Sequence, residues 1–567
     1  MTTYVSSSSN PQPPTRTNRR RFAAWFWLSG LVFAVASVPY LYAVFSRPED
    51  RVYTGLMFDV VDHAQYWSWV TASRAGLFIS NTMTPEANPR IFMNPMMWLL
   101  ARIQTALGLS FPALFQVWRA GATLLLVLGV LGLFRSLAFD RQRRVTALCV
   151  ALVGSGLGWV LVLAKIFLRL SDVPFPMDVY LVDPNTFFNL LGYPHLALAQ
   201  ALLLLTLLGV WRAYRGGGWP AHLLGGASAL GLALSHAYDL LTVYLVLLGF
   251  AVWVMVRRRA IPWSLVVSGI VIGACSAPVA FYYQNLTAHD ALWRSVLAQY
   301  ANAGVWTPVH FHLVILMGLP LLLAIAGLVP ATPRDERFWF VTVWFAVGLV
   351  LIYLPVVYQI KFLGGWQFPI AILAAGAWHD RIVPRLSRWF ARLPDLVVSP
   401  GTACRGVLVL LVIPTNLYLF SWRFVELRRH AAPYYLHRDE AAALDWLARH
   451  KTERDVVLAP EVIGQFVPNY GETRAYLAHW AMTNRYYERA ANVRRFFDPA
   501  TSEDWRETLI RSEGVTMVLR AGAAPGLAHT WDPRGSSLFE PLLILPKAEL
   551  YRFRSLDNQQ AVPEGVR

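Results

Sequence analysis

The stretch Arg19–Phe45 reads RRRFAAWFWLSGLVFAVASVPYLYAVF, three arginines followed by a long uncharged, mostly apolar run. The run is longer than the ~20 residues that a helix needs to cross the hydrocarbon core of a bilayer. Basic residues ahead of an apolar run are also typical of a signal peptide, but this run is long and no clean small-residue cleavage site ends it. We therefore interpret Phe22–Phe45 as a first transmembrane helix.

The segment ahead of this helix, residues 1–21, has a different composition. Its first part is rich in Ser, Thr, Pro and Asn, and such a sequence buries too little apolar surface to fold. We expect residues 1–21 to form a disordered tail whose arginines keep it on the cytoplasmic side of the membrane.

Similar apolar runs continue along the chain. Hydrophobic residues make up 56% of the sequence and charged residues 15%, against roughly a quarter charged in soluble proteins, which excludes a water-soluble protein. The chain is expected to cross the membrane about eleven times. The runs after the first lie near residues 111–134, 145–167, 186–210, 220–235, 240–256, 261–283, 309–328, 338–358, 366–378 and 407–422.

The formal net charge of +16 would suggest a nucleic-acid partner in a soluble chain. Here the arginines gather in alternate short loops, as in Arg257–Arg259, whereas the intervening loop Ser171–Asn185 has three aspartates and no basic residue. This distribution follows the positive-inside rule. It predicts a multi-pass protein of the cell (inner or plasma) membrane, surrounded by membrane lipids, with a cytoplasmic N-terminus and no nucleic-acid partner.

The composition becomes that of a soluble domain from about Tyr434. Short apolar runs at 456–458, 517–519 and 542–545 are typical of buried strands, and 440–449 has a helical pattern. We therefore divide the chain into the tail, a membrane domain at 22–430 with a first outer loop at 46–110, and an extracytoplasmic α/β domain at 431–567. Cys149, Cys275 and Cys404 show neither a disulfide nor a zinc-binding pattern.

The first outer loop contains the residues that are best suited to chemistry. Asp62, Tyr66 and Trp69 lie at helical spacing on one face, and Asp59 lies one turn earlier. Two such carboxylates can bind a divalent metal ion such as Mg or Mn, or one can accept a proton while the other orients it. The alternative is that Asp59 and Asp62 only cap the helix or solvate the loop.

The order of features in this region resembles that of the GT-C superfamily of integral-membrane glycosyltransferases. Within it, the resemblance is to the branch of protein O-mannosyltransferases and bacterial aminoarabinose transferases. The features are one span, an acidic loop with Asp62 and Tyr66 four residues apart, Gly76-Leu77-Phe78, Asn94–Leu100 (NPMMWLL), Gly108-Leu109-Ser110 and Arg119 opening the next span. The resemblance implies a mainly α, polytopic GT-C-like bundle that carries the C-terminal α/β domain.

Carried onto this sequence, the resemblance implies that Asp62 is the catalytic loop carboxylate and that Tyr66 is the motif tyrosine. His63 stands where the branch has a glutamate, which puts a role for a second carboxylate at that position in doubt. Asp59 is the other candidate for such a role, and Tyr66 and His63 are substrate-binding candidates. The resemblance also implies a donor built on a polyprenyl phosphate and reaction at the outer face of the membrane.

A departing lipid phosphate needs cations, and Lys361 lies at the predicted outer end of a span, at the depth of the Asp62 loop. Snorkelling of its side chain to the headgroup region is the alternative. The neighbouring Trp366, on the same outer face, is grouped with it as a substrate-binding candidate. His195 and His236 also lie at outer ends of spans, where each is either a substrate-binding residue or a hydrogen-bonding residue of a helix end.

The first hypothesis for the function is an inverting glycosyltransferase that moves a sugar from a polyprenyl-phosphate-linked donor to a lipid, glycan or protein acceptor. In this hypothesis Asp62 is the base, Asp59 its helper or a metal ligand, and Lys361 the phosphate partner. Two alternatives stay open. One is a carrier of lipid-linked saccharides in which the acidic loop gates access, and the other is an envelope assembly subunit that docks partners on its C-terminal domain.

Overall fold

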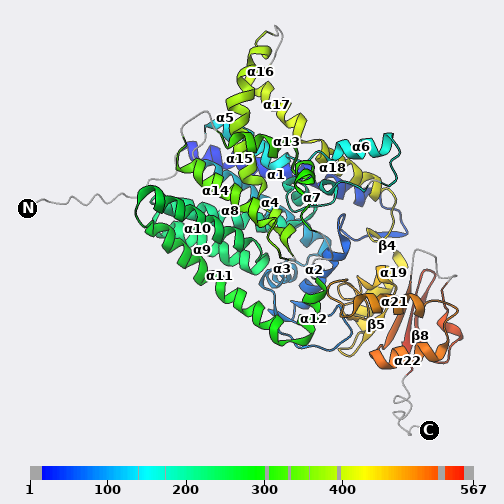
Figure 1. Ribbon diagram of the computed structural model, residues 1–567. Helices are drawn as coiled ribbons and strands as arrows, with labels where there is room; N and C mark the ends of the chain where they lie inside the picture. Colours follow the sequence, from blue (N-terminus) through cyan, green and yellow to red (C-terminus); the bar gives the residue numbers. More distant parts are fainter. Residues whose placement is uncertain are drawn as a thin grey trace, which may run out of the picture.

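The computed structural model describes residues 16–137, 140–172, 174–300, 306–329, 334–356, 358–392, 398–521 and 530–554. Figure 1 shows a large helical body and, after α18, a smaller region that contains a β-sheet. Residues 1–15 of the predicted tail lie outside the described residues. The first helix begins at Arg16 rather than at Phe22, since arginine favours the helical conformation and extends the helix beyond its apolar run.

Long helices make up the body. Their bounds are α1 (Arg16–Phe45), α4 (Phe111–Ser136), α5 (Arg141–Val153), α6 (Gly158–Phe167), η1 (Met177–Val179), α7 (Thr186–Gly192), α8 (Pro194–Tyr214), α9 (Gly218–Ser235), α10 (Asp239–Arg258), α11 (Trp263–His289), α12 (Ala291–Tyr300), α13 (His310–Gly327), α14 (Glu336–Leu351), η3 (Gln359–Leu363), α15 (Gln367–Ala377), η4 (Trp378–Ile382), α16 (Val383–Phe390), α17 (Pro400–Val412) and α18 (Pro414–Leu427).

Each predicted apolar run coincides with one of these helices or with a pair of consecutive helices. By length and composition, seven helices of the described chain can cross a membrane, or up to nine if each of two bent pairs counts as one span. The prediction was about eleven. The difference lies in α9, which is rich in small and polar residues, and in α14, which has only 16 residues.

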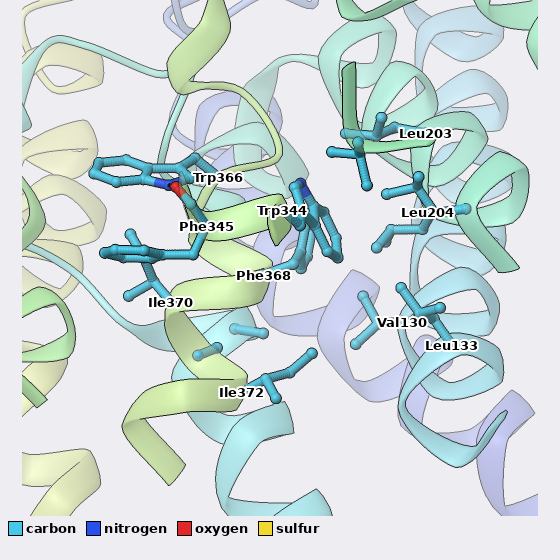
Figure 2. Packing of buried hydrophobic residues seen from close by; sticks show 14 of the residues in the cluster. Val130, Leu133, Leu203, Leu204, Trp344, Phe345, Trp366, Phe368, Ile370 and Ile372 are labelled. Atoms are coloured by element: carbon cyan, nitrogen blue, oxygen red, sulfur yellow. Dashed lines mark hydrogen bonds between the residues drawn. The ribbon is translucent and has the colours of Figure 1, made fainter. Parts of the chain in front are cut away.

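The centre of the body is an apolar core in which α15 packs against α13, α14 and α5. Figure 2 shows Trp344 of α14 beside Phe368 of α15, with Leu203 and Leu204 of α8 opposite. Nearly every residue of α15 is buried, which identifies it as a central helix that is apolar on all sides. This explains why so short a run, 366–378, is nonetheless strongly hydrophobic.

The first loop contains its own small elements between α1 and α4. They are β1 (Arg51–Tyr53), α2 (Val60–Ala72), β2 (Phe78–Ile79), β3 (Phe92–Met93) and α3 (Pro95–Leu107). The side chain of Asn94 accepts a hydrogen bond from the amide of Met97 and begins α3, and Ser110 caps α4 in the same way. Trp67 of α2 stacks on Phe111 of α4 with the ring centroids 4.4 Å apart, which fixes α2 on the membrane domain.

The C-terminal region is an α/β unit, as predicted. Its elements are β4 (Tyr435–His437), α19 (Arg438–His450), β5 (Val456–Leu458), α20 (Glu461–Gly464), β6 (Arg474–Ala475), α21 (Tyr486–Phe496), α22 (Glu503–Glu513), β7 (Met517–Ala521), η6 (Pro533–Gly535), β8 (Phe539–Leu545) and β9 (Ala548–Phe553). The strand order is β6-β5-β7-β9-β8. β5 runs parallel to β6 and β7, and β9 runs antiparallel to β7 and β8.

The first loop binds the α/β region along its length. β1 pairs with β4 in an antiparallel ladder. Further along, the amide of Ala475 donates to the carbonyl of Thr82 at 3.0 Å, and Glu86 pairs with the buried Arg489 at 2.8 Å. The loop that contains the acidic motif is therefore held between the helical body and the C-terminal region.

Candidate active site

The helix α2 begins at Asp59, whose backbone is left-handed (φ 37°, ψ 56°). Aspartate tolerates this conformation better than most residues, but it is strained and is often found at functional sites. The Asp59 side chain makes no cap hydrogen bond of normal geometry, although the Asp62 amide lies close enough to lower its pKa. The conformation turns the Asp59 carboxylate away from a simple capping role and towards Asp62.

The carboxylate of Asp62 is fixed by a residue from the C-terminal region. Nε2 of His479 lies 2.8 Å from Asp62 Oδ1, and the amide of Ala481 donates to His479 Nδ1 at 3.1 Å. Because Nδ1 accepts a hydrogen bond, the ring proton is on Nε2 and is donated to Asp62. His479 is only 2% exposed, whereas 38% of the Asp62 side chain remains exposed, so a ligand can still reach Asp62.

The two aspartates differ in their charge state. Asp59 presents part of its surface to solvent, but the protein packed around its carboxylate removes much of the surrounding water. This desolvation, together with the negative charge of Asp62, raises the pKa of Asp59 to about 7. Burial also acts to raise the pKa of Asp62, but the hydrogen bond and electrostatic attraction of His479 outweigh it and lower that pKa. Near neutral pH, Asp62 is therefore ionised, whereas Asp59 is protonated in part of the molecules.

His63 lies on the buried side of α2. Its Nδ1 contacts the carbonyl of Asp59 at 2.9 Å, and its ring packs at 5.3 Å from both Phe115 and Tyr193. Burial lowers the pKa of His63, so the ring is neutral near pH 7. His63 thus supports the turn at Asp59 from behind instead of supplying a second charge to the site.

Tyr66 extends the same face of α2 towards the helical body. Its hydroxyl lies 3.3 Å from Nε2 of His195, which is in the first turn of α8, and the two rings are 4.7 Å apart. Tyr66 also contacts Trp69, with the ring centroids 5.8 Å apart, so the two rings share one side of α2, and α8 brings His195 to it.

Lys361 lies in η3, and its Nζ is 3.7 Å from Oδ1 of the buried Asp183. Its positive charge acts to lower the pKa of both Asp59 and Asp62, so the ammonium group lies within electrostatic reach of both carboxylates. Two segments that are far apart in sequence, the first loop and η3, therefore contribute opposite charges to one region.

His236 ends α9 and pairs with Asp239 at the start of α10, with Nδ1 and Oδ2 3.1 Å apart. Both His236 and Lys361 lie within electrostatic reach of His195. Tyr238, in the same turn as His236, packs on Tyr358 next to η3 with the ring centroids 4.7 Å apart. The α9–α10 turn therefore borders the same region as Lys361.

Trp366 is in a different environment from the other predicted residues. It is 1% exposed, and its Nε1 donates to the carbonyl of Phe345 at 2.9 Å inside the core (Figure 2). A Cβ atom at Gly348 would lie only 2.1 Å from its ring, so α14 packs directly on the indole. We leave Trp366 out of the proposed site because no ligand at the surface can reach it.

The site offers few ligands to a metal ion. Within the described residues, no group of three or more His, Cys, Asp and Glu side chains is arranged to hold one. Asp59 and Asp62 supply two carboxylates, one oxygen of which already binds His479, and the positive charge of Lys361 is nearby. These residues do not fit a metal centre held by the protein alone.

Sequence reasoning did not single out His479 and Asp183 as site residues. In the sequence, His479 is followed by Trp480, and Asp183 precedes a proline. Their partners are remote in sequence, since His479 lies 417 positions after Asp62. Only the predicted outer position of both segments indicated that they lie at the same end of the molecule as Asp62.

No protein-family model matches the sequence, and no curated protein matches it. Solved structures do match. The chain is similar to ArnT from Cupriavidus metallidurans in the apo state, with a TM-score of 0.51 and 13% identity over 94% of this chain and 98% of that chain. It is also similar to the Archaeoglobus fulgidus oligosaccharyltransferase in complex with Zn and sulfate, with a TM-score of 0.53 and 13% identity over 86% and 68%.

A third match is archaeal oligosaccharyltransferase AglB from Archaeoglobus fulgidus, in complex with an inhibitory peptide and a dolichol-phosphate. Its TM-score is 0.51 at 12% identity, over 87% of this chain and 69% of that chain. ArnT and AglB are both GT-C glycosyltransferases. This chain has the GT-C fold. The predicted fold class, a helical membrane bundle with a C-terminal α/β region, is thereby confirmed.

Proposed function

We propose that the protein is a membrane glycosyltransferase that moves a sugar from a polyprenyl-phosphate-linked donor to a lipid, glycan or protein acceptor at the extracytoplasmic face. One observation carries the proposal. In a GT-C fold, the carboxylates of Asp59 and Asp62 lie within electrostatic reach of the ammonium group of Lys361. Such a site offers a base for the acceptor and a cation for the leaving group.

A lipid-phosphate donor is supported from two directions. AglB has been solved with a dolichol-phosphate bound, so a GT-C fold of this kind can hold a polyprenyl phosphate. In this chain, Lys361 is partly exposed at 24%, while its partner Asp183 is buried. The ammonium group can thus contact a phosphate on its open side while Asp183 holds it from behind.

The reaction is a single displacement. The acceptor oxygen attacks the anomeric carbon while the bond from that carbon to the phosphate oxygen breaks on the opposite face, which inverts the configuration. Asp62 takes the acceptor proton, and polyprenyl phosphate leaves with the electron pair of the broken bond. The Nε2 proton of His479 keeps Asp62 ionised and fixed in orientation, so that the base is ready before the acceptor binds.

Asp59 has a separate part in this mechanism. The sugar ring gains positive charge as the bond to phosphate breaks, and a second ionised carboxylate beside Asp62 stabilises that charge. Because the pKa of Asp59 is raised to about 7, this contribution depends on pH. No step of the mechanism passes through a metal ion, since the residues present do not fit one.

Replacing Asp62 with Asn tests the assignment. The variant keeps the shape of the side chain and removes its charge, and a lost general base lowers the rate about a hundred-fold or more. The assay measures release of free polyprenyl phosphate and of glycosylated product from a panel of polyprenyl-phosphate sugars. Asp172→Asn, an exposed aspartate of another predicted outer loop, is the matched control and is expected to retain activity.

Full transfer by Asp62→Asn would reject Asp62 as the base. A carrier of lipid-linked saccharides, in contrast, would bind the donors and release no free polyprenyl phosphate even with the native residue. An assembly subunit would keep its partner after Asp59 and Asp62 are both neutralised. These three outcomes separate the proposed enzyme from its alternatives.

A further inference from the structure

A charged cavity lies at the opposite ends of the helices that border the candidate active site. Its volume is about 580 Å³. Four arginines, two carboxylates and two tryptophans line it, which are Arg215, Arg257, Arg334, Arg337, Asp335, Glu336, Trp253 and Trp339. The lining therefore has an excess of positive charge.

Both carboxylates of the cavity are already engaged. Glu336 binds Arg258 at 2.5 Å and Arg215 at 3.5 Å. Asp335 caps α14 by accepting from the amides of Arg337 and Phe338, at 3.1 and 3.0 Å, and its Oδ2 lies 3.5 Å from Nε of Arg337. Both carboxylates are therefore occupied by arginines other than Arg257 and Arg334.

Two arginines retain unsatisfied positive charge. Within the described part of the chain, the side chain of Arg257 makes no hydrogen bond or ion pair. Among the described residues, the guanidinium of Arg334 contacts aromatic rings alone, at 5.7 Å from the centroid of Phe338 and 5.8 Å from that of Trp339. Both arginines are exposed, so their charge is available to an anion in the cavity.

The aromatic residues of the cavity indicate its depth. Trp253 of α10 and Trp339 of α14 stack at 5.6 Å between ring centroids and 25° between planes. Both lie about one turn from the polar end of their helix, and tryptophans at helix ends favour the headgroup level of a bilayer. A ligand of this cavity would therefore meet arginines towards water and indoles towards the hydrocarbon.

The helices themselves place the cavity far from the candidate active site. α10 begins beside His236 and Asp239, and ends at Arg258 next to the cavity. At 1.5 Å per residue, a helix of this length spans about 30 Å, which is the thickness of a hydrocarbon core. α8 likewise begins at the Tyr66–His195 contact and ends beside Arg215. The two regions are thus at opposite faces of the membrane.

We propose that this cavity binds the phosphate headgroup of an anionic phospholipid, in the leaflet opposite the candidate active site. A guanidinium group pairs with phosphate through two parallel hydrogen bonds, and basic pockets between membrane helices are suited to such headgroups. The acyl chains would lie along Trp253 and the outer surfaces of α10 and α14. The lipid would link the ends of α8, α10 and α14 at this face.

The test uses the full-length protein in mild detergent, with mixed micelles that contain either phosphatidylglycerol or phosphatidylcholine. Lipid retention is measured by native mass spectrometry and Tm by thermal melting. The test variant is the double substitution Arg257→Gln and Arg334→Gln, in which both residues are exposed, so folding should persist. Arg385→Gln with Arg388→Gln, two exposed arginines of α16, is the matched control for loss of charge elsewhere in a predicted cytoplasmic segment.

We expect phosphatidylglycerol to bind more tightly and to raise Tm more than phosphatidylcholine. Loss of both arginines should weaken phosphatidylglycerol binding about thirty-fold, while the α16 control stays within about two-fold of the native protein. Unchanged binding in the double variant, or an equal loss in the control, would overturn the proposal. So would an equal rise of Tm with inorganic phosphate alone, because the cavity would then hold a free anion.

Discussion

Asp59 and Asp62 lie one helical turn apart, yet their surroundings drive their protonation in opposite directions. His479 holds Asp62 ionised, and burial beside a like charge raises the pKa of Asp59 to about 7. Pairs of titratable groups with divergent pKa values are typical of sites that move protons. The difference in pKa between the two carboxylates therefore characterises the candidate site better than their mere presence.

The first residue-scale prediction concerns pH. If ionised Asp59 stabilises the charged sugar, kcat/KM should rise about ten-fold per pH unit below a midpoint near 7 and then level off. The sign follows from the raised pKa, because the helpful ionised form accumulates only as pH increases through that value. A pH profile of transfer measures this, and Asp59→Asn should lack the limb near 7. A limb of unchanged midpoint in that variant would contradict the role of Asp59.

The second residue-scale prediction concerns His479, a positioning residue. Removal of a hydrogen bond to a charged group costs about 1.5–3 kcal/mol, so His479→Ala should lower kcat at least about ten-fold. It should also raise the pH below which Asp62 becomes protonated, since the Nε2–H donor that keeps this carboxylate ionised is lost. His479→Gln places an amide donor near Nε2 and should restore much of both. A purely structural role for His479 would leave the pH profile unmoved.

Sequence spacing could predict the shared face of Asp62 and Tyr66 because a helix repeats every 3.6 residues. It could not decide whether Asp59 caps α2 or adds its carboxylate to the site, since both roles require an aspartate at the start of the helix. In the structure the backbone of Asp59 is left-handed, and Nδ1 of His63 contacts its carbonyl. These features favour the second role. The His479 contact was beyond reach because tertiary folding alone brings the two segments together.

Among the elements, the loop between α2 and α3 is held by one buried cation. Arg489 of α21 is 1% exposed and binds Glu86 of the loop and Glu513 of α22, each at 2.8 Å. The two glutamates compensate the positive charge of Arg489 from two sides. Burial acts to raise the pKa of Glu86, but the hydrogen bonds from Arg489 outweigh burial and lower that pKa to about 2. The first loop is thereby tied to the C-terminal region.

The element-scale prediction is that Arg489→Met strongly weakens this docking. Removal of Arg489 leaves the half-buried Glu86 without a cation and leaves Glu513 only its pair with Arg485. The cost is about 3 kcal/mol, the low end for a broken buried pair. Arg485→Met is the matched control, since Arg485 binds the same Glu513 from a half-exposed position and such pairs contribute at most about 1 kcal/mol. Hydrogen exchange of residues 77–94 measures the effect. Equal protection in both variants would contradict it.

The bent helices show why apolar runs predict spans better than they predict helix geometry. The sequence predicts one span for each of the runs near 145–167 and 407–422, but the pair α5 and α6 is bent by 45°, and the pair α17 and α18 by 56°. The two breaks contact one another, since the amide of Ser155 donates to the carbonyl of Val412 at 2.8 Å. The amide of Gly158 donates to Asp178. A helix can break within a membrane only when the backbone groups freed at the break find other hydrogen-bond partners. Here those partners are remote in sequence.

For the whole molecule, the candidate site combines segments that only the distribution of arginines along the sequence assigns to one face of the membrane. The alternation of arginine-rich loops assigned the first loop, the segment 171–185 and the C-terminal region to the outer side. In the structure Asp62, His195, Lys361 and His479 are gathered at one end of the bundle. The alternation of inner and outer loops depends only on whether the number of spans between two loops is odd or even. It could therefore predict this grouping, although α9 and α14 do not meet the length and composition expected of a span.

The whole-molecule prediction is that the two ends of the bundle are accessible from opposite sides of the membrane. After replacement of Cys149, Cys275 and Cys404 with Ala, single cysteines are introduced at Asp172, Glu488 and Arg385, which are all exposed. In right-side-out vesicles, a membrane-impermeant maleimide should label Asp172→Cys and Glu488→Cys at once, and Arg385→Cys only after permeabilisation. The physical reason is that α8 and α10 separate the two ends by about 30 Å of hydrocarbon. Labelling of all three positions from one side would mean that these helices do not cross the bilayer, and the candidate active site and the arginine cavity would then face the same compartment.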